Sequence, residues 1–354
     1  MSPDSNYLAE QLAKQIAASG PISVAEYMRQ ANSAYYAKGD PFGVDGDFIT
    51  APEISQMFGE MVGLWFADLW LRSARAGQHN LVELGPGRGT LIADILRAVG
   101  KFEFDPDVHL IENSELLRNA QLQNAPLAKH HDSIDTLPSQ GPLFIVANEF
   151  FDALPIRQYI ATHAGWRERV LVRERGTKFS AMPGTLGVEH LIPTEFRNAP
   201  TSSIYENSPD CADAIFALSR RLAAQGGALL IIDYGYALPG LGSTLQAVKA
   251  HAYADPFENP GAHDLTAHVN FAEIANLARS QDLAVYGPVG QGKWLTALGI
   301  DMRVEQLSNA APERAAEIRA MRDRLVDSAQ MGTLFKVMAI SSTEMPRPEG
   351  FASA

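Results

Sequence analysis

The chain has 354 residues, with 29 Lys and Arg against 41 Asp and Glu, so its formal net charge is −12 at pH 7. Nucleic acid is bound mainly through clustered Lys and Arg, so this balance argues against a protein whose main ligand is a phosphate backbone. It suits a neutral or cationic partner, although acidity can also serve solubility alone. The single cysteine, Cys211, excludes an intrachain disulfide and a multi-cysteine zinc site, and we expect it to be a small buried residue.

The N-terminal part of the chain, residues 1–77, is predicted to be a helical extension. Its first twenty residues have no basic segment followed by an apolar stretch, and they contain two acids but no arginine. They therefore resemble neither a signal peptide nor a transit peptide, and we expect a cytoplasmic protein. Ser23 and Glu26 have the spacing of a capping box, which predicts a helix that runs towards Tyr36.

A second helix is predicted to begin at Thr50. Pro52 stands in its first turn and Glu53 follows three residues after the cap. The helix is apolar on most of its faces, but Glu60 and Asp68 interrupt it. Charges in the middle of a membrane span are costly, so we predict a buried core helix and no membrane insertion.

From residue 79 the pattern changes to short apolar runs that alternate with helices, which predicts βαβ units and a parallel sheet. The core strands are expected at Asn80–Leu84, Val108–Glu112, Leu143–Asn148 and Ala228–Asp233. The intervening helices are expected to start near Thr90, Ser114 and Pro209. Three alternating runs between residues 156 and 181 predict antiparallel strands inserted after the fourth core strand. Strands at Ala284–Tyr286 and Leu334–Ile340 should close the sheet edge, and residues 342–354 are predicted to be a disordered tail.

A glycine-rich loop follows the first core strand. The run LVELGPGRGTL places Gly85, Gly87 and Gly89 at the mouth of a helix, where glycines let the backbone turn tightly and approach a ligand. The dinucleotide fingerprint needs a small residue at position 90, where Thr90 stands, and no Gly-Lys-Ser/Thr follows as in a Walker loop. The loop alone therefore does not indicate which ligand binds, and the residues around it must be considered.

Acidic residues at the ends of neighbouring strands supply those surroundings. Glu112 closes the second strand, where a carboxylate can accept both hydroxyls of a ribose. Glu83 precedes the loop and could lie under the amino group of a zwitterion such as S-adenosylmethionine. The third strand should end near Asp132 and Ser133, where a side chain can meet an adenine edge. We favour S-adenosylmethionine, with a nicotinamide dinucleotide or a simple tight turn as alternatives.

A second acidic loop follows the fourth core strand. The run FIVANEFFDALP ends that strand in Asn148 and Glu149 and then supplies Asp152. In an open α/β sheet this edge lines the ligand crevice. Methyl transfer is an in-line displacement, so catalysis consists mostly of holding the two reacting atoms about 3 Å apart. Two carboxylates could orient an arginine guanidinium, which is always cationic and presents a planar fork of donors. A capped turn whose acids face water is the alternative.

With these residues the chain resembles the MidA-like family, class I methyltransferases related to the mitochondrial complex I assembly factor that methylates arginine. The resemblance covers about residues 7–341. The matching stretches are GPISVAEYM, GDFITAPEISQMFGEMVGLW, VELGPGRGTL, ANEFFDALP, LLIIDYGY and DLTAHVNF. The glycine loop is generic to methyltransferases, whereas GDFITAPEIS together with NEFFDALP is far more specific.

The resemblance implies an α/β fold: a class I methyltransferase, Rossmann-like seven-stranded sheet with an N-terminal helical extension or lid and an inserted β element. The core would cover residues 78–341, with insertions at about 156–205 and 238–270. The donor would be S-adenosylmethionine, with S-adenosylhomocysteine as product. The acceptor would be an arginine of a protein, with a subunit of NADH:ubiquinone oxidoreductase as partner. The chain departs from the mitochondrial relatives in lacking a presequence, so it looks like a bacterial member.

The site residues expected from motif position fall into three groups. The catalytic acids are Glu149 and Asp152. The donor-binding residues are Glu83, Gly85, Pro86, Gly87, Gly89, Glu112, Asp132, Ser133, Asn148 and Thr50. The acceptor-side residues are Tyr36, Asp47, Glu53, Asp233, Tyr234 and His268. No metal is expected, because the histidines near Asp264 lack further ligands at suitable spacing. Two rival functions remain: a small-molecule methyltransferase of the same fold, and an assembly or scaffold protein that binds the donor but has little activity.

Overall fold

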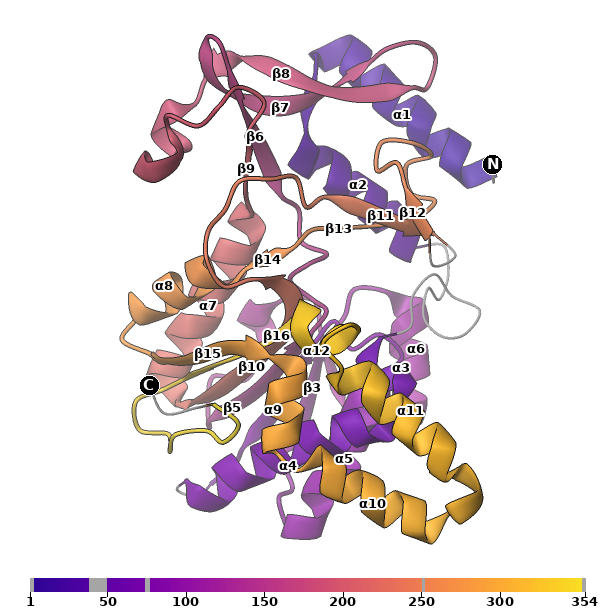
Figure 1. The fold of residues 1–354 in the computed structure, drawn as a ribbon, viewed down its shortest axis with the longest axis vertical. Coiled ribbons are helices and arrows are strands. Elements are labelled where there is room, and N and C mark those ends of the chain that lie inside the picture. The colour runs from indigo at the N-terminus through magenta and orange to yellow at the C-terminus, as the bar shows by residue number, and fades with distance from the viewer. Residues whose placement is uncertain (1–2, 38–49, 74–76, 250–251, 352–354) are drawn as a thin grey trace.

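The computed structural model describes residues 3–37, 50–73, 77–249 and 252–351. Figure 1 shows a twisted sheet flanked by helices and, above it, a smaller lobe of antiparallel strands that lies beside the first two helices. The carboxyl ends of the central parallel strands point towards the region between these two parts.

The central sheet has the strand order β15-β16-β10-β5-β2-β3-β4, which confirms the predicted seven-stranded core. Its strands are β2 (Asn80–Leu84), β3 (Asp107–Ile111), β4 (Lys129–His131), β5 (Leu143–Asn148), β10 (Gly227–Tyr236), β15 (Ala284–Gly290) and β16 (Phe335–Ser341), with β14 (Val269–Asn270) paired to the end of β10. The strands from β4 to β10 are parallel, whereas β16 runs antiparallel to both of its neighbours. The last strand in sequence therefore lies inside the sheet, and β15 forms the edge.

Helices cover both faces of this sheet. They are α4 (Gln56–Arg72), α5 (Thr90–Val99), α6 (Glu115–Asn124), α7 (Pro209–Gln225), α8 (Phe271–Arg279), α9 (Gln291–Ala297), α10 (Ile300–Ala310), α11 (Ala315–Val326) and α12 (Met331–Leu334). Short 3-10 turns occupy Gly100–Phe102, Ile134–Thr136, Glu189–Leu191, Thr194–Phe196 and Pro312–Arg314. None of the helices in the described ranges is both long and apolar enough to cross a membrane.

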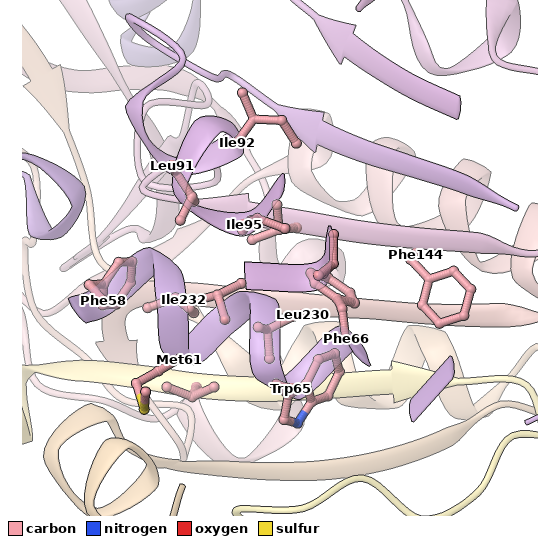
Figure 2. Packing of buried hydrophobic residues seen from close by; sticks show 14 of the residues in the cluster. Phe58, Met61, Trp65, Phe66, Leu91, Ile92, Ile95, Phe144, Leu230 and Ile232 are labelled. Carbon is pink, nitrogen blue, oxygen red and sulfur yellow. The ribbon is translucent and has the colours of Figure 1, made fainter. Parts of the chain in front are cut away.

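The larger core lies between the sheet and helices α4 and α5. Figure 2 shows Phe58, Trp65 and Phe66 of α4 packed near Ile92 of α5 and Phe144 of β5, and all five side chains are buried. Two glycines of α4 allow the close contact with α5: a Cβ at position 59 or 63 would lie 2.4 Å or 2.7 Å from a Cβ of α5. Since α5 starts directly after the glycine loop, this packing fixes the position of that loop.

The predicted helix from Thr50 is broken into two. Helix α3 (Ala51–Ile54) ends at Ser55, which is extended with φ −162° and ψ 135°, and α4 begins at the next residue. The Ser55 hydroxyl accepts a hydrogen bond from the N–H of Met57 at 3.2 Å and so caps α4, a local bond that competes with continued helix. Thr50 occupies the predicted cap position but makes no side-chain cap bond.

The smaller lobe joins the N-terminal helices to the predicted insertions. It contains α1 (Pro3–Ser19), β1 (Ile22–Ser23), α2 (Val24–Tyr36), β6 (Arg157–Thr162), β7 (Gly165–Arg173), β8 (Phe179–Gly187), β9 (Ile204–Asn207), β11 (Gln246–Lys249), β12 (Ala252–Ala254) and β13 (Asp264–Thr266). The antiparallel β6-β7-β8 pairing confirms the three alternating runs, and the Ser23 hydroxyl caps α2 as predicted, accepting from the N–H of Glu26 at 3.0 Å. Strand β1 pairs with β7, and the two N-terminal helices share a buried cluster with β7, β8, β11 and β13. A boundary at residue 77 stays a prediction.

The C-terminal segment differs from the predicted disordered tail as far as residue 351. Phe351 is buried beside Tyr286, and the indole N–H of Trp65 donates to the carbonyl of Glu349 at 3.1 Å. Phe351, an aromatic side chain in a mostly polar, Pro-rich stretch, therefore holds the C-terminal segment against the α4 face of the sheet.

Candidate active site

Two adjoining pockets lie at the carboxyl ends of β2, β3 and β5, and Gly85 lines both. One is a narrow slot between α3, the glycine loop and the end of β5. It contains the predicted donor residues Thr50, Glu83, Gly85, Pro86, Gly87 and Asn148. The other is a wide pocket of about 910 Å³ that contains Glu112, Asp132 and Ser133. Of the predicted donor residues, Gly89 lines neither; it is the N-cap of α5 and packs against Gln121.

The glycine loop requires glycine for its backbone. Gly85, Gly87 and Gly89 have φ values of 61°, 53° and 81°, in the left-handed region that other residues adopt only with strain. A Cβ at Gly85 would also lie 3.0 Å from the ring of Phe150. At its glycines the loop therefore presents backbone, at Gly85 to both pockets and at Gly87 to the narrow slot.

Glu83 is a buried acid at the base of the slot. It is 3% exposed, and it accepts a hydrogen bond from the N–H of Ile92 in the first turn of α5. Its Oε2 is buried and has no hydrogen-bond partner among the described residues, and burial raises the pKa of this carboxyl to about 8. A cationic amino group in the slot would supply the missing partner, so this residue fits the ammonium of S-adenosylmethionine.

The two predicted acids of the wide pocket, Glu112 and Asp132, are already hydrogen-bonded within the protein. Glu112 accepts from the N–H of Ser114 at 2.8 Å and from the side-chain amide of Gln121 at 3.4 Å, which fixes the carboxylate at the pocket wall. Asp132 forms an ion pair with Arg118, and the Asp132 side chain is largely exposed. The geometry is compatible with the ribose and adenine contacts expected here, and those contacts stay predictions.

Glu149 lies at the inner end of the slot in a strained conformation. Its φ is 52°, a left-handed value that is costly for a residue with a side chain and that tends to persist at functional sites. Its N–H donates to the carbonyl of Ile232 at 2.9 Å, and its Oε1 accepts from the side chain of Asn148 at 3.2 Å and from the N–H of Ala51 at 3.4 Å. Burial and the nearby Asp152 raise its pKa to about 8.

Asp152 lies behind Glu149 and is not part of the slot lining. It is 5% exposed, the Tyr234 hydroxyl donates to it, and its Oδ1 is buried without a partner. Burial raises its pKa to about 6. The two predicted catalytic acids are therefore brought together, but only Glu149 reaches the slot in the described part of the chain.

Asp233 faces the backbone of the acidic loop rather than the slot. It is fully buried; its Oδ2 accepts from the N–H groups of Phe151 and Asp152 at 3.0 and 3.2 Å, and its Oδ1 from the N–H of Tyr234 at 3.0 Å. Burial and the neighbouring carboxylates raise its pKa well above the usual range. This is the geometry of a residue that positions the loop, in contrast to the acceptor contact expected from the sequence.

The other residues expected on the acceptor side are dispersed. Tyr36 lines the wide pocket and donates to Asp264 at 3.0 Å, and Glu53 lines the narrow slot next to the donor residues. The ring of His268 lies 5.6 Å from that of Tyr234 but lines a different cavity, between α7 and α8. Asp47 lies outside the described residues.

Phe150 and Thr90 are among the lining residues that sequence reasoning missed. Phe150 covers Gly85 and lines the wide pocket, and Thr90 donates its hydroxyl to Glu53 across the slot. The paired phenylalanines of NEFFDALP could have indicated the first, since the residue after a strand end points into the same crevice. Cys211 is half-buried, and in the described ranges no three His, Cys, Asp or Glu side chains are placed to hold a metal ion.

The chain resembles known proteins over most of its length. Residues 61–289 match the family described as "Putative S-adenosyl-L-methionine-dependent methyltransferase". The protein arginine methyltransferase NDUFAF7 homolog of Drosophila melanogaster mitochondria is 36% identical, covering 94% of this chain and 84% of its own; the human mitochondrial NDUFAF7 is 33% identical, covering 94% and 83%. A Burkholderia thailandensis protein described as a "likely methyl transferase", whose crystal structure holds S-adenosyl-homocysteine, is 25% identical, with a TM-score of 0.85 over 99% of this chain and 96% of that one.

Proposed function

Because the chain belongs to this family of S-adenosyl-L-methionine-dependent methyltransferases, we propose that it methylates an arginine side chain of a protein. The observation that carries the proposal is the acidic pair at the inner end of the slot, with Glu149 in the lining and Asp152 behind it. Two relatives named as protein arginine methyltransferases support it, since they match nearly the whole chain.

The glycine loop and Glu83 of the slot fit the donor. The glycine loop offers backbone at left-handed positions, and Glu83 has an unpaired buried oxygen. When bound, S-adenosyl-L-methionine supplies a methyl group carried on a cationic sulfonium. Glu83 would hold the amino group of the donor and Glu112 its ribose. The glycine loop would lie against the part of the donor that joins these two groups.

Glu149 can both grip a guanidinium and take its proton. Replacing an N–H by N–CH3 on a guanidinium releases one proton, and an ionised carboxylate in contact with that nitrogen can accept it. In the free protein the raised pKa keeps Glu149 largely protonated at pH 7, and a bound guanidinium favours its ionised form. Asp152 contributes to that raised pKa and so makes Glu149 a better base.

The partner that we propose is a subunit of NADH:ubiquinone oxidoreductase, in line with the family resemblance. The purified chain should transfer labelled methyl from S-adenosylmethionine to this complex when the complex is isolated from cells that lack the gene. We expect the label in the protein fraction, and none when the complex comes from cells that carry the gene, because its site is then already methylated. Label recovered only in a small-molecule filtrate would overturn the protein acceptor and favour a small-molecule methyltransferase.

A further inference from the structure

The narrow slot holds more acidic side chains than the donor's amino group requires. Among the residues that the structure describes, three acids, Glu53, Glu83 and Glu149, line it together with one base, Arg88. The family's donor carries two cations, an ammonium and a sulfonium, and one carboxylate. The excess of acids therefore matches the two donor cations and one further cation from an acceptor.

Two of the three acids are already matched to one of these cations. Glu83 lies at the end of β2 beneath the glycine loop, with one unpaired oxygen for the ammonium. Glu149 lies at the end of β5 beside Asp152, on the side proposed for the acceptor. The third acid, Glu53, belongs to α3, a different wall of the slot.

The structure holds Glu53 in a defined orientation. Its Oε1 accepts a hydrogen bond from the Thr90 hydroxyl at 2.7 Å, which ties α3 to the first residue of α5. The rigid Pro52 precedes it in the first turn of α3, and the N–H of Glu53 donates to the carbonyl of Thr50 at 3.0 Å. The Thr90 bond holds the carboxylate, and the backbone bond and Pro52 hold the turn that carries it, so less entropy is left to lose on binding.

We propose that Glu53 selects the methylated, sulfonium-bearing donor over the demethylated product, by placing a carboxylate where only the donor carries positive charge. The product keeps the ammonium and the carboxylate but has a neutral thioether. An acid that faces the sulfur therefore distinguishes the two molecules, whereas Glu83 interacts with a group that both share. The same charge would favour release of the product, which limits its inhibition of the next cycle. This inference concerns donor binding and does not depend on arginine being the acceptor.

Calorimetric titration of the purified chain with S-adenosylmethionine and with S-adenosylhomocysteine tests the proposal. Glu53→Gln should weaken donor binding by about 3- to 10-fold and product binding by less than about 2-fold, as expected for the loss of one partly exposed charge contact. Glu83→Gln is the matched control and should weaken both ligands by the same factor. Glu305→Gln, an exposed acid on α10, removes one negative charge elsewhere and should change neither.

The proposal is wrong if Glu53→Gln weakens both ligands equally or weakens neither. Thr90→Val provides a second variant should Glu53→Gln unfold, because it keeps the carboxylate and removes only the hydroxyl that orients it. It should weaken donor binding more than product binding, and an equal effect on the two ligands would also overturn the proposal.

Discussion

Replacing Glu149 by Gln is expected to lower kcat for methyl transfer by about 10²- to 10⁴-fold, the usual contribution of a positioned general base. The amide keeps the size of the side chain but can neither accept the acceptor's proton nor carry the charge that attracts a cation. Binding of S-adenosylhomocysteine should change by less than threefold, because in the proposed function Glu149 contacts the acceptor and not the donor.

Initial rates with a methylatable protein, together with titration of S-adenosylhomocysteine, measure this effect. In the wild type kcat/KM should rise with pH and level off above about 8, because the ionised form of Glu149 is the active one and its pKa is raised to about 8. The variant should lose that rise. If the Glu149→Gln protein keeps the wild-type rate, the carboxylate takes no part in the chemistry. An assembly or scaffold function that survives the substitution would agree with that result.

Replacing Glu83 by Gln is expected to weaken binding of S-adenosylhomocysteine by about 10- to 100-fold, the range for losing a hydrogen bond to a charged group. The variant should also release fewer protons on binding. At pH 7 the raised pKa keeps Glu83 mostly protonated in the free protein, whereas the ammonium of the ligand requires the ionised carboxylate. Binding to the wild type should therefore expel nearly one proton from this group.

Calorimetry in two buffers with different heats of ionisation counts that proton. The wild type should release close to one more proton per ligand than Glu83→Gln does. Glu305→Gln serves again as the control for net charge and should match the wild type. Equal proton release in the wild type and in Glu83→Gln would show that the carboxylate does not meet the amino group.

Local patterns predicted the sheet and the glycine loop well. Strands β2 and β5 begin and end at the predicted residues, because each is a short apolar run bounded by polar turns, and α5 begins at Thr90 directly after the loop. The fold of this layer is encoded in segments of five to ten residues, so a single sequence suffices to recognise it.

Features that depend on distant contacts were not predictable in the same way. The break at Ser55 lies in a run that is apolar enough for one helix. Helix α3 is held over the slot by contacts with distant residues, the bonds of Glu53 with Thr90 and of Ala51 with Glu149. Asp233 ends the predicted strand, although β10 continues to Tyr236, and nothing local shows that one of its oxygens is occupied by the backbone of another loop. The sequence pattern identifies the acids at the sheet edge, but their directions come from tertiary structure.

The most direct test of the proposed function is to identify the methylated residue. The purified chain would be incubated with methyl-labelled S-adenosylmethionine and the unmethylated respiratory complex, and the labelled protein analysed by tandem mass spectrometry. We predict methylarginine, in an amount that falls at least a hundredfold when Glu149→Gln replaces the wild type, as expected for the loss of a general base. Label on lysine, on a carboxyl group or on a small molecule, or an equal yield from the variant, would contradict the proposal that the acidic pair presents an arginine to the donor.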